Sequence, residues 1–106
     1  QIISDVAPTQ GGDDTGLDPH ELTEAALAAC TSMTLAMYAK RKNWNLLDAE
    51  VVVKIEKEGS ESLFSRKIKL IGDLTDEQKN SLLTIANKCP IHKLLTSRIQ
   101  IESSLA

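Results

Sequence analysis

The pattern of hydrophobic and polar positions predicts a long helix in the first half of the chain. Residues 25–30 are apolar on nearly every side of a helical projection, which is typical of a helix buried on most of its faces. Asp18 suits the N-cap, Pro19 suits the first helical position, and Glu21 has the spacing of a capping box. We therefore expect a helix over about residues 19–42.

Two β-strands joined by a tight turn are predicted next. Apolar side chains occupy every second position from Ala49 to Ile55, which gives a strand with one apolar face. Residues 59–62 (GSES) suit a turn, and residues 63–71 return as the second strand of a hairpin.

A second helix follows the hairpin. Residues 75–78 (TDEQ) have the form of another capping box, and the helix should continue to about residue 88. Its apolar face carries Leu82, Ile85, Ala86 and Cys89, which are three or four residues apart. Pro90 should end this helix and start a further turn over residues 91–95. Ile99 and Ile101 then predict a final short strand.

This order of elements predicts an α+β fold in which a long buried central helix and a second helix pack on an antiparallel sheet. The 106 residues suit a single domain, with residues 1–18 as an extended leader and a Gly-rich loop. So small a chain has little material with which to surround the apolar first helix. A second copy of the chain is the natural cover, so we expect a homodimer.

Charge and hydropathy exclude several classes of protein. The net charge is −3 and the cationic residues are scattered, whereas a nucleic-acid surface needs a clustered basic face. The most apolar stretch, residues 25–39, is shorter than the roughly 20 residues that span a membrane. The first residues do not resemble a signal peptide. We therefore expect a cytoplasmic protein that binds neither nucleic acid nor membranes.

Two cysteines, Cys30 and Cys89, are the candidates for chemistry. In a reducing compartment such residues are redox-active, metal-binding or buried as small hydrophobic side chains more often than they form a permanent disulfide. Cys30 lies in a run of alanines, and these small side chains leave space around its sulfur. Cys89 precedes Pro90 at the start of a helical turn, where backbone N–H groups favour a thiolate. A thiolate is what reaction with a peroxide requires.

Several segments of the chain resemble the OsmC/Ohr superfamily of thiol-dependent hydroperoxide reductases. The similarity extends over most of residues 3–102 and follows the family order. The segments are residues 16–22 (GLDPHEL), 25–31 (AALAACT), 37–44 (MYAKRKNW), 72–75 (GDLT) and 89–93 (CPIHK).

This resemblance implies an OsmC-like intertwined homodimer with active sites at the subunit interface. It implies a stress-response peroxidase in which Cys30 attacks an organic or fatty-acid hydroperoxide and Cys89 resolves the product. A dithiol, typically on a lipoylated protein, would return the electrons, and neither a cofactor nor a metal is implied. An apolar pocket for the substrate beside Cys30 would draw on Leu27, Met33 and Met37, although such residues at helical spacing are also typical of a core.

The chain departs from the family pattern at two supporting residues. Family peroxidases place an arginine from an N-terminal strand beside the reactive cysteine, but no arginine precedes Arg41 here. The family glutamate, expected ten residues before the cysteine, is replaced by His20, with Glu21 one position later. We take Glu21 as the catalytic helper and His20 as a substrate-orienting residue, while the capping box gives Glu21 a competing structural role. Arg66 could substitute as the cation, or its stem could cover apolar surface with its head in water.

Two other readings of the same residues remain open. Without the arginine, the chain could be a weakened OsmC-fold protein that binds a small apolar or thiol-reactive ligand. Residues 89–92 (CPIH) also have the short spacing of a zinc-ligand pair. However, His20 and Cys30 are about 15 Å apart along a helix, which disfavours one shared metal site.

Overall fold

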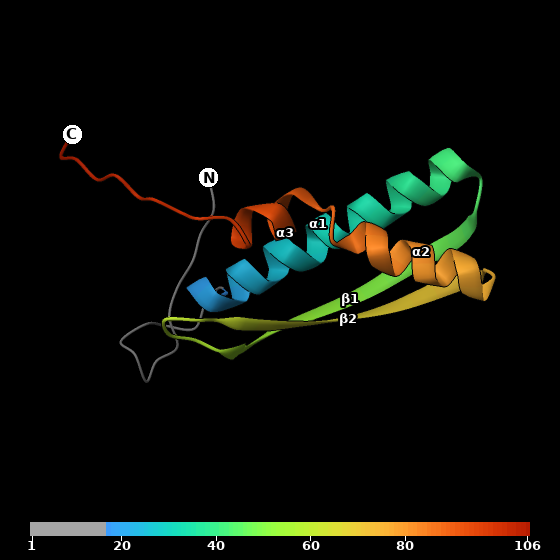
Figure 1. The fold of residues 1–106 in the computed structure, drawn as a ribbon, viewed down its shortest axis with the longest axis horizontal. Coiled ribbons are helices and arrows are strands. Elements are labelled where there is room, and N and C mark those ends of the chain that lie inside the picture. The colour runs from blue at the N-terminus through green and yellow to red at the C-terminus, as the bar shows by residue number, and fades with distance from the viewer. Residues whose placement is uncertain (1–16) are drawn as a thin grey trace.

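The computed structural model describes residues 17–106, so the predicted leader and Gly-rich loop lie almost entirely outside the described residues. Three helices lie on one face of a two-stranded antiparallel sheet (Figure 1). In chain order the elements are α1 (Pro19–Lys42), β1 (Asn45–Lys57), β2 (Leu63–Asp73), α2 (Asp76–Ala86) and α3 (Pro90–Leu95). The predicted α+β fold is therefore confirmed.

Helix α1 has the predicted boundaries because both of its ends are capped. The Asp18 carboxylate accepts a hydrogen bond from the Glu21 backbone N–H at 2.8 Å, and the Glu21 carboxylate accepts one from the Asp18 N–H at 3.4 Å. Asn43 ends the helix in the left-handed conformation, with φ of 57°. One face of the helix is buried, and the buried residues on it are four apart: Leu27, Thr31, Leu35 and Ala39.

The opposite face of α1 is open in the single chain. Met33 and Met37 are 64% and 69% exposed, and Ala25, Ala26, Ala29 and Ala36 are exposed beside them. The expectation of a helix buried on most sides is therefore not met by this chain alone, because α2, α3 and the sheet cover only one face of α1. We call these six residues the α1 stripe.

The hairpin places one apolar face of the sheet against α1. Ala49 and Val53 are buried, whereas Glu50, Val52 and Lys54 are exposed, as the alternation predicts. Two side chains of α1 also bond the backbone of β1: Glu24 accepts from the Ile55 N–H at 2.8 Å, and Ser32 donates to the Ala49 carbonyl at 3.3 Å. These bonds fix how α1 lies along the strand.

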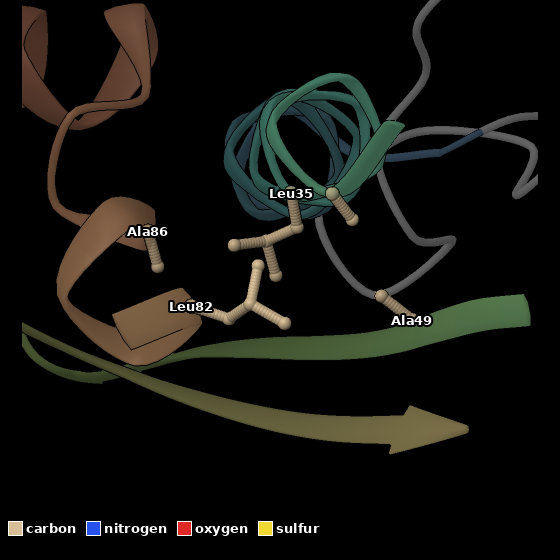
Figure 2. Packing of buried hydrophobic residues seen from close by; sticks show 5 residues of the cluster. Leu35, Ala49, Leu82 and Ala86 are labelled. Atoms are coloured by element: carbon tan, nitrogen blue, oxygen red, sulfur yellow. The ribbon is translucent and has the colours of Figure 1, made fainter. Parts of the chain in front are cut away.

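Helices α2 and α3 complete the core. A capping box of Thr75 and Gln78 starts α2 as predicted, and the helix ends at Ala86, two residues before the expected end. Leu82 of α2 and Leu35 of α1 are both fully buried, and their side chains face one another beside Ala86 and Ala49 (Figure 2). Cys89, also fully buried, is the N-cap residue of α3, the turn predicted after Pro90.

The final strand predicted at Ile99 and Ile101 is wrong. Residues 98–106 form no regular structure and run away from the sheet (Figure 1), and Ile99 and Ile101 are 56% and 86% exposed. Alternating apolar residues become a strand only when another strand satisfies their backbone groups, and the described sheet offers no such pairing here. Among residues 17–106, no helix is both long enough and apolar enough to cross a bilayer.

Candidate active site

Cys30 and Cys89 come together although 59 residues separate them in the sequence. Cys30 lies in the middle of α1, and Cys89 lies between α2 and α3. Each thiol shifts the pKa of the other, so the two lie close together, and neither is in a disulfide. Cys89 is fully buried in a cluster with Leu27 and Val53, while Cys30 at its margin is partly exposed. A reagent from solution therefore meets Cys30 first.

The surroundings of Cys89 favour its charged form. Burial acts to raise the pKa of the Cys89 thiol, but hydrogen bonds to its sulfur outweigh that effect and hold the pKa below its usual value. The strongest of these comes from the Cys30 thiol. The backbone N–H groups of His92 and Ile91, in the first turn of α3, and the hydroxyl of Thr31 add to it.

Cys30 shows the opposite tendency. Burial and the hydrogen bond to Cys89 raise the pKa of the Cys30 thiol, and weaker bonds from the Ile91 N–H and the Thr34 hydroxyl only partly oppose them. The two directions belong together because the titrations of the two thiols are coupled.

A cation lies close to this pair. The Arg66 guanidinium, on β2, donates from Nη1 to the Thr31 hydroxyl at 3.1 Å and from Nη2 to the Asn87 side-chain oxygen at 2.9 Å. Thr31 is fully buried, and its hydroxyl donates to the Leu27 carbonyl at 2.7 Å. Arg66 is partly buried, and its head group joins β2 to α1 and to the end of α2.

Two pockets flank the cysteines. The first, which we call the hairpin pocket, has a volume of about 490 Å³. Its lining is Leu27, Ser62, Leu63, Phe64, Arg66, His92, Leu95 and Thr96. Burial and the nearby Arg66 charge lower the pKa of His92, so its imidazole is neutral at pH 7 and Arg66 carries the positive charge on this side.

The second pocket, which we call the α1/α2 groove, has a volume of about 430 Å³. Its lining is Thr34, Met37, Tyr38, Arg41, Ile85, Lys88 and Pro90. The Thr34 hydroxyl acts to lower the pKa of Cys30, and Pro90 directly follows Cys89. The groove therefore includes a sequence neighbour of Cys89 and a residue one helical turn from Cys30, and Arg41 and Lys88 add two cations to its apolar lining.

The other residues expected in the site are dispersed. Met37 lines the α1/α2 groove and Leu27 the hairpin pocket, whereas Met33 lies on the exposed stripe and lines neither. Glu21 serves the capping box and lies nine residues before Cys30, about 14 Å along the helix axis. The structure thus does not bring Glu21 to the cysteines.

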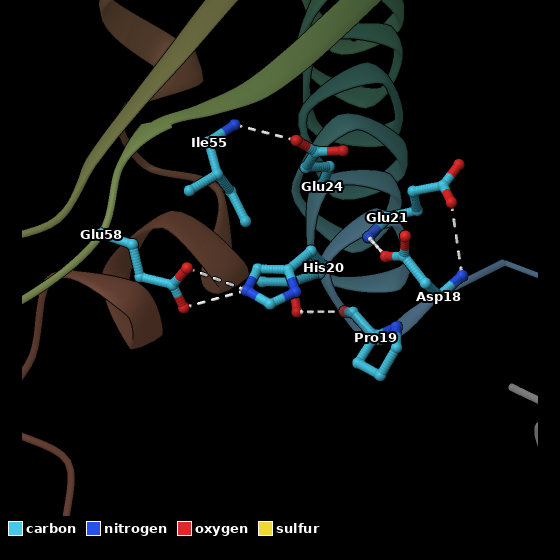
Figure 3. Close-up of polar contacts among 8 residues, drawn as sticks. Asp18, Pro19, His20, Glu21, Glu24, Ile55 and Glu58 are labelled. Carbon is cyan, nitrogen blue, oxygen red and sulfur yellow. Dashed lines mark hydrogen bonds and ion pairs between the residues drawn. The ribbon is translucent and has the colours of Figure 1, made fainter. Parts of the chain in front are cut away.

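His20, expected to orient the substrate, pairs with Glu58. Its Nε2 lies 2.9 Å and 3.0 Å from the two carboxylate oxygens of Glu58, at the end of β1 (Figure 3). Both side chains are largely exposed and line a third pocket, of about 250 Å³, with Pro19 and Ile55. His20 therefore joins the start of α1 to the hairpin rather than lying beside the thiols.

No role was expected for Thr31 and Thr34, whose hydroxyls act to lower the pKa of Cys89 and of Cys30 respectively. The position of Thr34, four residues after Cys30 on the same helix, is the signal that could have found it. As for the metal reading, residues 17–106 contain no group of three or more His, Cys, Asp or Glu side chains placed to hold an ion.

Solved structures share this fold. A candidate osmotic stress induced and detoxification response protein from Psychrobacter arcticus 273-4 has a TM-score of 0.73 at 20% identity, covering 88% of this chain and 70% of its own. The organic hydroperoxide resistance protein OhrB of Bacillus subtilis has a TM-score of 0.57 at 30% identity, with coverages of 90% and 73%.

A third similar structure is a candidate organic hydroperoxide resistance protein from Vibrio cholerae O1 biovar eltor str. N16961, with captopril bound in one of its active sites. Its TM-score is 0.63 at 25% identity, and the match covers 87% of this chain and 67% of its own. A comparison with curated protein sequences gives no significant match.

The family assignment comes from the sequence as a whole. The model of the family described as OsmC-like protein matches residues 11–104, which is nearly the entire chain. The structural matches agree with it, since OhrB of Bacillus subtilis is 30% identical over most of both chains. The chain therefore belongs to the OsmC-like protein family.

Proposed function

We propose that this protein is a thiol-dependent peroxidase that reduces organic hydroperoxides with Cys30 and Cys89. The observation that carries the proposal is that the two thiols, which come from separate elements of the fold, lie close enough for each to shift the pKa of the other. Family membership supports a peroxide-related function, and so do the names of the similar organic hydroperoxide resistance proteins.

In the first step Cys30 is the nucleophile, because it is the cysteine that solvent reaches. Its sulfur attacks one oxygen of the hydroperoxide and the O–O bond breaks, so that sulfur loses two electrons and an alcohol leaves. The Cys89 thiolate accepts the Cys30 proton during the attack and returns it to the departing alkoxide. Cys30 is then a sulfenic acid and Cys89 is again a thiolate.

In the second step the Cys89 thiolate attacks the Cys30 sulfenic sulfur. A disulfide forms and hydroxide leaves, which becomes water on taking up a proton. A dithiol reductant, such as a lipoylated protein, then exchanges with the disulfide: its two thiols become a disulfide, and Cys30 and Cys89 become thiols again.

The α1/α2 groove is the site we propose for the organic part of the substrate. Met37, Tyr38 and Ile85 give it an apolar wall, and Thr34 in its lining is one helical turn after Cys30. Arg41 and Lys88 add positive charge, which suits the carboxylate of a fatty-acid hydroperoxide.

A second copy of the chain is the partner we propose for the α1 stripe. Exposed methionines and alanines along one helix face are typical of an interface between subunits. Met37 belongs both to the stripe and to the groove, so the second copy would lie at the mouth of the substrate site. Light scattering should give the mass of a dimer, and Met33→Asp should give a monomer. A monomeric wild type would refute this partner.

The test of the function is stopped-flow oxidation of the reduced protein by an organic hydroperoxide, a fatty-acid hydroperoxide and hydrogen peroxide. We expect consumption much faster than by free cysteine, and fastest for the organic substrates. Cys30→Ser should abolish it, and Cys89→Ser should accumulate one sulfenic acid per chain. A wild type no faster than free cysteine would refute the peroxidase. If instead Cys89→Ser were the one variant that lost hydroperoxide consumption, Cys89 would be the attacking cysteine and Cys30 the resolving cysteine.

A second candidate function is an OsmC-fold protein that binds a small apolar or thiol-reactive ligand. The observation that favours it is the raised pKa of Cys30, since a thiol that keeps its proton is slow with peroxides. Under this reading Cys30→Ser would leave peroxide consumption unchanged at the level of free cysteine. Calorimetry with an apolar thiol-reactive compound would instead show binding that Cys30→Ser weakens.

A further inference from the structure

The hairpin pocket lies at the end of the molecule where the hairpin turn, α1 and α3 come together (Figure 1). Its walls are apolar and come from three elements: Leu27 of α1, Phe64 of β2 and Leu95 of α3. Leu27 belongs to the buried cluster that holds Cys89 and Val53, and the other two walls pack against that cluster. The core therefore holds the walls in place, and the pocket does not need a ligand to form it.

Arg66 supplies a positive charge to this pocket, and no carboxylate of the described chain is paired with it. Its side chain is partly buried, and its two hydrogen bonds go to neutral groups, the Thr31 hydroxyl and the Asn87 side-chain oxygen. The ion pair that the described residues do form, between His20 and Glu58, lines a different pocket. A cation that is partly withdrawn from water is stabilised by an anion beside it.

The guanidinium can still bind an acceptor. Each of its two bonds uses one of the five N–H groups that an arginine offers, so donors remain. His92, the other ionisable side chain in the lining, is neutral at pH 7. The pocket therefore combines apolar walls with a single positive charge, which matches one negative charge on a ligand and would leave a second one unpaired.

We propose that the hairpin pocket binds a small apolar monocarboxylate whose carboxylate group pairs with Arg66. The planar fork of a guanidinium fits a carboxylate, and the apolar body of the ligand lies against Leu27, Phe64 and Leu95. This site is separate from the α1/α2 groove, because the linings of the two pockets share no residue. The proposal therefore goes beyond the proposed peroxidase and does not depend on it.

The experiment is a titration of the reduced protein with octanoate, followed by NMR of the histidine imidazoles. His92 lines the hairpin pocket and His20, the other histidine of the chain, lines another, so His20 is an internal reference. Octanoate should shift the His92 signal saturably and raise the pKa of His92, because it offsets the Arg66 charge that lowers this pKa. Octanol, which has the same chain without the charge, should not raise it. His20→Gln assigns the two signals.

Two pairs of variants locate the carboxylate. Arg66→Met should weaken octanoate binding, measured from the His92 signal, by about tenfold or more, because one charge-assisted interaction is lost. Lys67→Met removes an exposed cation from the next residue of β2 and should leave the binding unchanged. Ser62→Asp and Ser60→Asp each add one negative charge to the exposed hairpin turn, but of these two serines only Ser62 lines the pocket. Ser62→Asp should therefore weaken binding clearly more than Ser60→Asp.

Each possible result supports or overturns the proposal. A His92 signal that octanoate does not shift saturably overturns it, and so does octanol that raises the pKa of His92 as octanoate does. Equal binding by Arg66→Met and Lys67→Met also overturns it. If Arg66→Met does not fold, the two serine variants decide, and equal weakening by both refutes the site. Octanoate that binds only in the α1/α2 groove would shift neither histidine. Because no hydroperoxide is used, failure of the peroxidase and failure of this site are separate results.

Discussion

Replacing Leu82 by alanine should destabilise the protein far more than replacing its neighbour Leu83. Leu82 is fully buried and packs against Leu35 and Ala86, so alanine would leave a cavity between α1 and α2 (Figure 2). Buried leucines lose about 3 kcal/mol on such truncation, within a range of roughly 2–5 kcal/mol. A domain of this size has a total stability of about 5–15 kcal/mol, so the loss is a large fraction.

Urea unfolding followed by circular dichroism measures this loss. With a slope of about 1–1.5 kcal/mol/M, the midpoint of Leu82→Ala should fall by about 2 M or more. Leu83 is 60% exposed, so Leu83→Ala is the matched control and should change the free energy of unfolding by no more than about 0.5 kcal/mol. Equal shifts in the two variants, or a loss below about 1 kcal/mol for Leu82→Ala, would refute this packing argument.

The same variant also bears on the cysteines, because Leu82 holds the helix that ends three residues before Cys89. If α2 is loosened, Cys89 should be less well placed to reach Cys30. Under the proposed mechanism, Leu82→Ala should therefore form the sulfenic acid at a normal rate but the disulfide more slowly. Mass spectrometry of quenched samples distinguishes the two species.

Three further changes have clear expected results. Gly72→Ala should lower the unfolding free energy by about 2 kcal/mol or more in urea titrations, because Gly72 has φ of 147° and a Cβ there would lie 2.0 Å from the Asn45 carbonyl oxygen. Thr75→Ala should cost about 1 kcal/mol in the same assay by removing the N-cap of α2. The hydrogen bond to Glu58 raises the pKa of His20, so its contribution should be complete below about pH 6.5 and lost as pH rises through the raised pKa. The difference in melting temperature between wild type and His20→Gln should shrink accordingly over that range.

The helices and the hairpin could be predicted from the sequence because their signals are local. The capping boxes at Asp18 and Thr75 specify where α1 and α2 begin, since the bonds they make close within four residues. Pro90 similarly specifies the start of α3. The end of α2 was less well predicted, because residues 87–89 form a turn that presents Cys89 to the core.

The segment around Ile99 and Ile101 shows the limit of such local signals. An alternation of apolar residues indicates which face of a strand would be buried, but a strand also needs a neighbouring strand to satisfy its backbone groups. In β1 and β2 the hairpin turn supplies that partner directly. After α3, no element of the described chain offers one, and the same alternation leaves two isoleucines exposed.

The role of Arg66 could be anticipated only in part, and the reason lies in the register of the hairpin. The alternation with Phe64 and Ile68 predicts that its side chain lies on the apolar face of β2. Its polar partners depend on the pairing of Arg66 with Val53, because residues directly opposite in an antiparallel pair lie on the same face. Val53 packs against Cys89, so this pairing brings the guanidinium to Thr31. A slip of one residue would send it to solvent, and no pattern within β2 alone distinguishes the two registers.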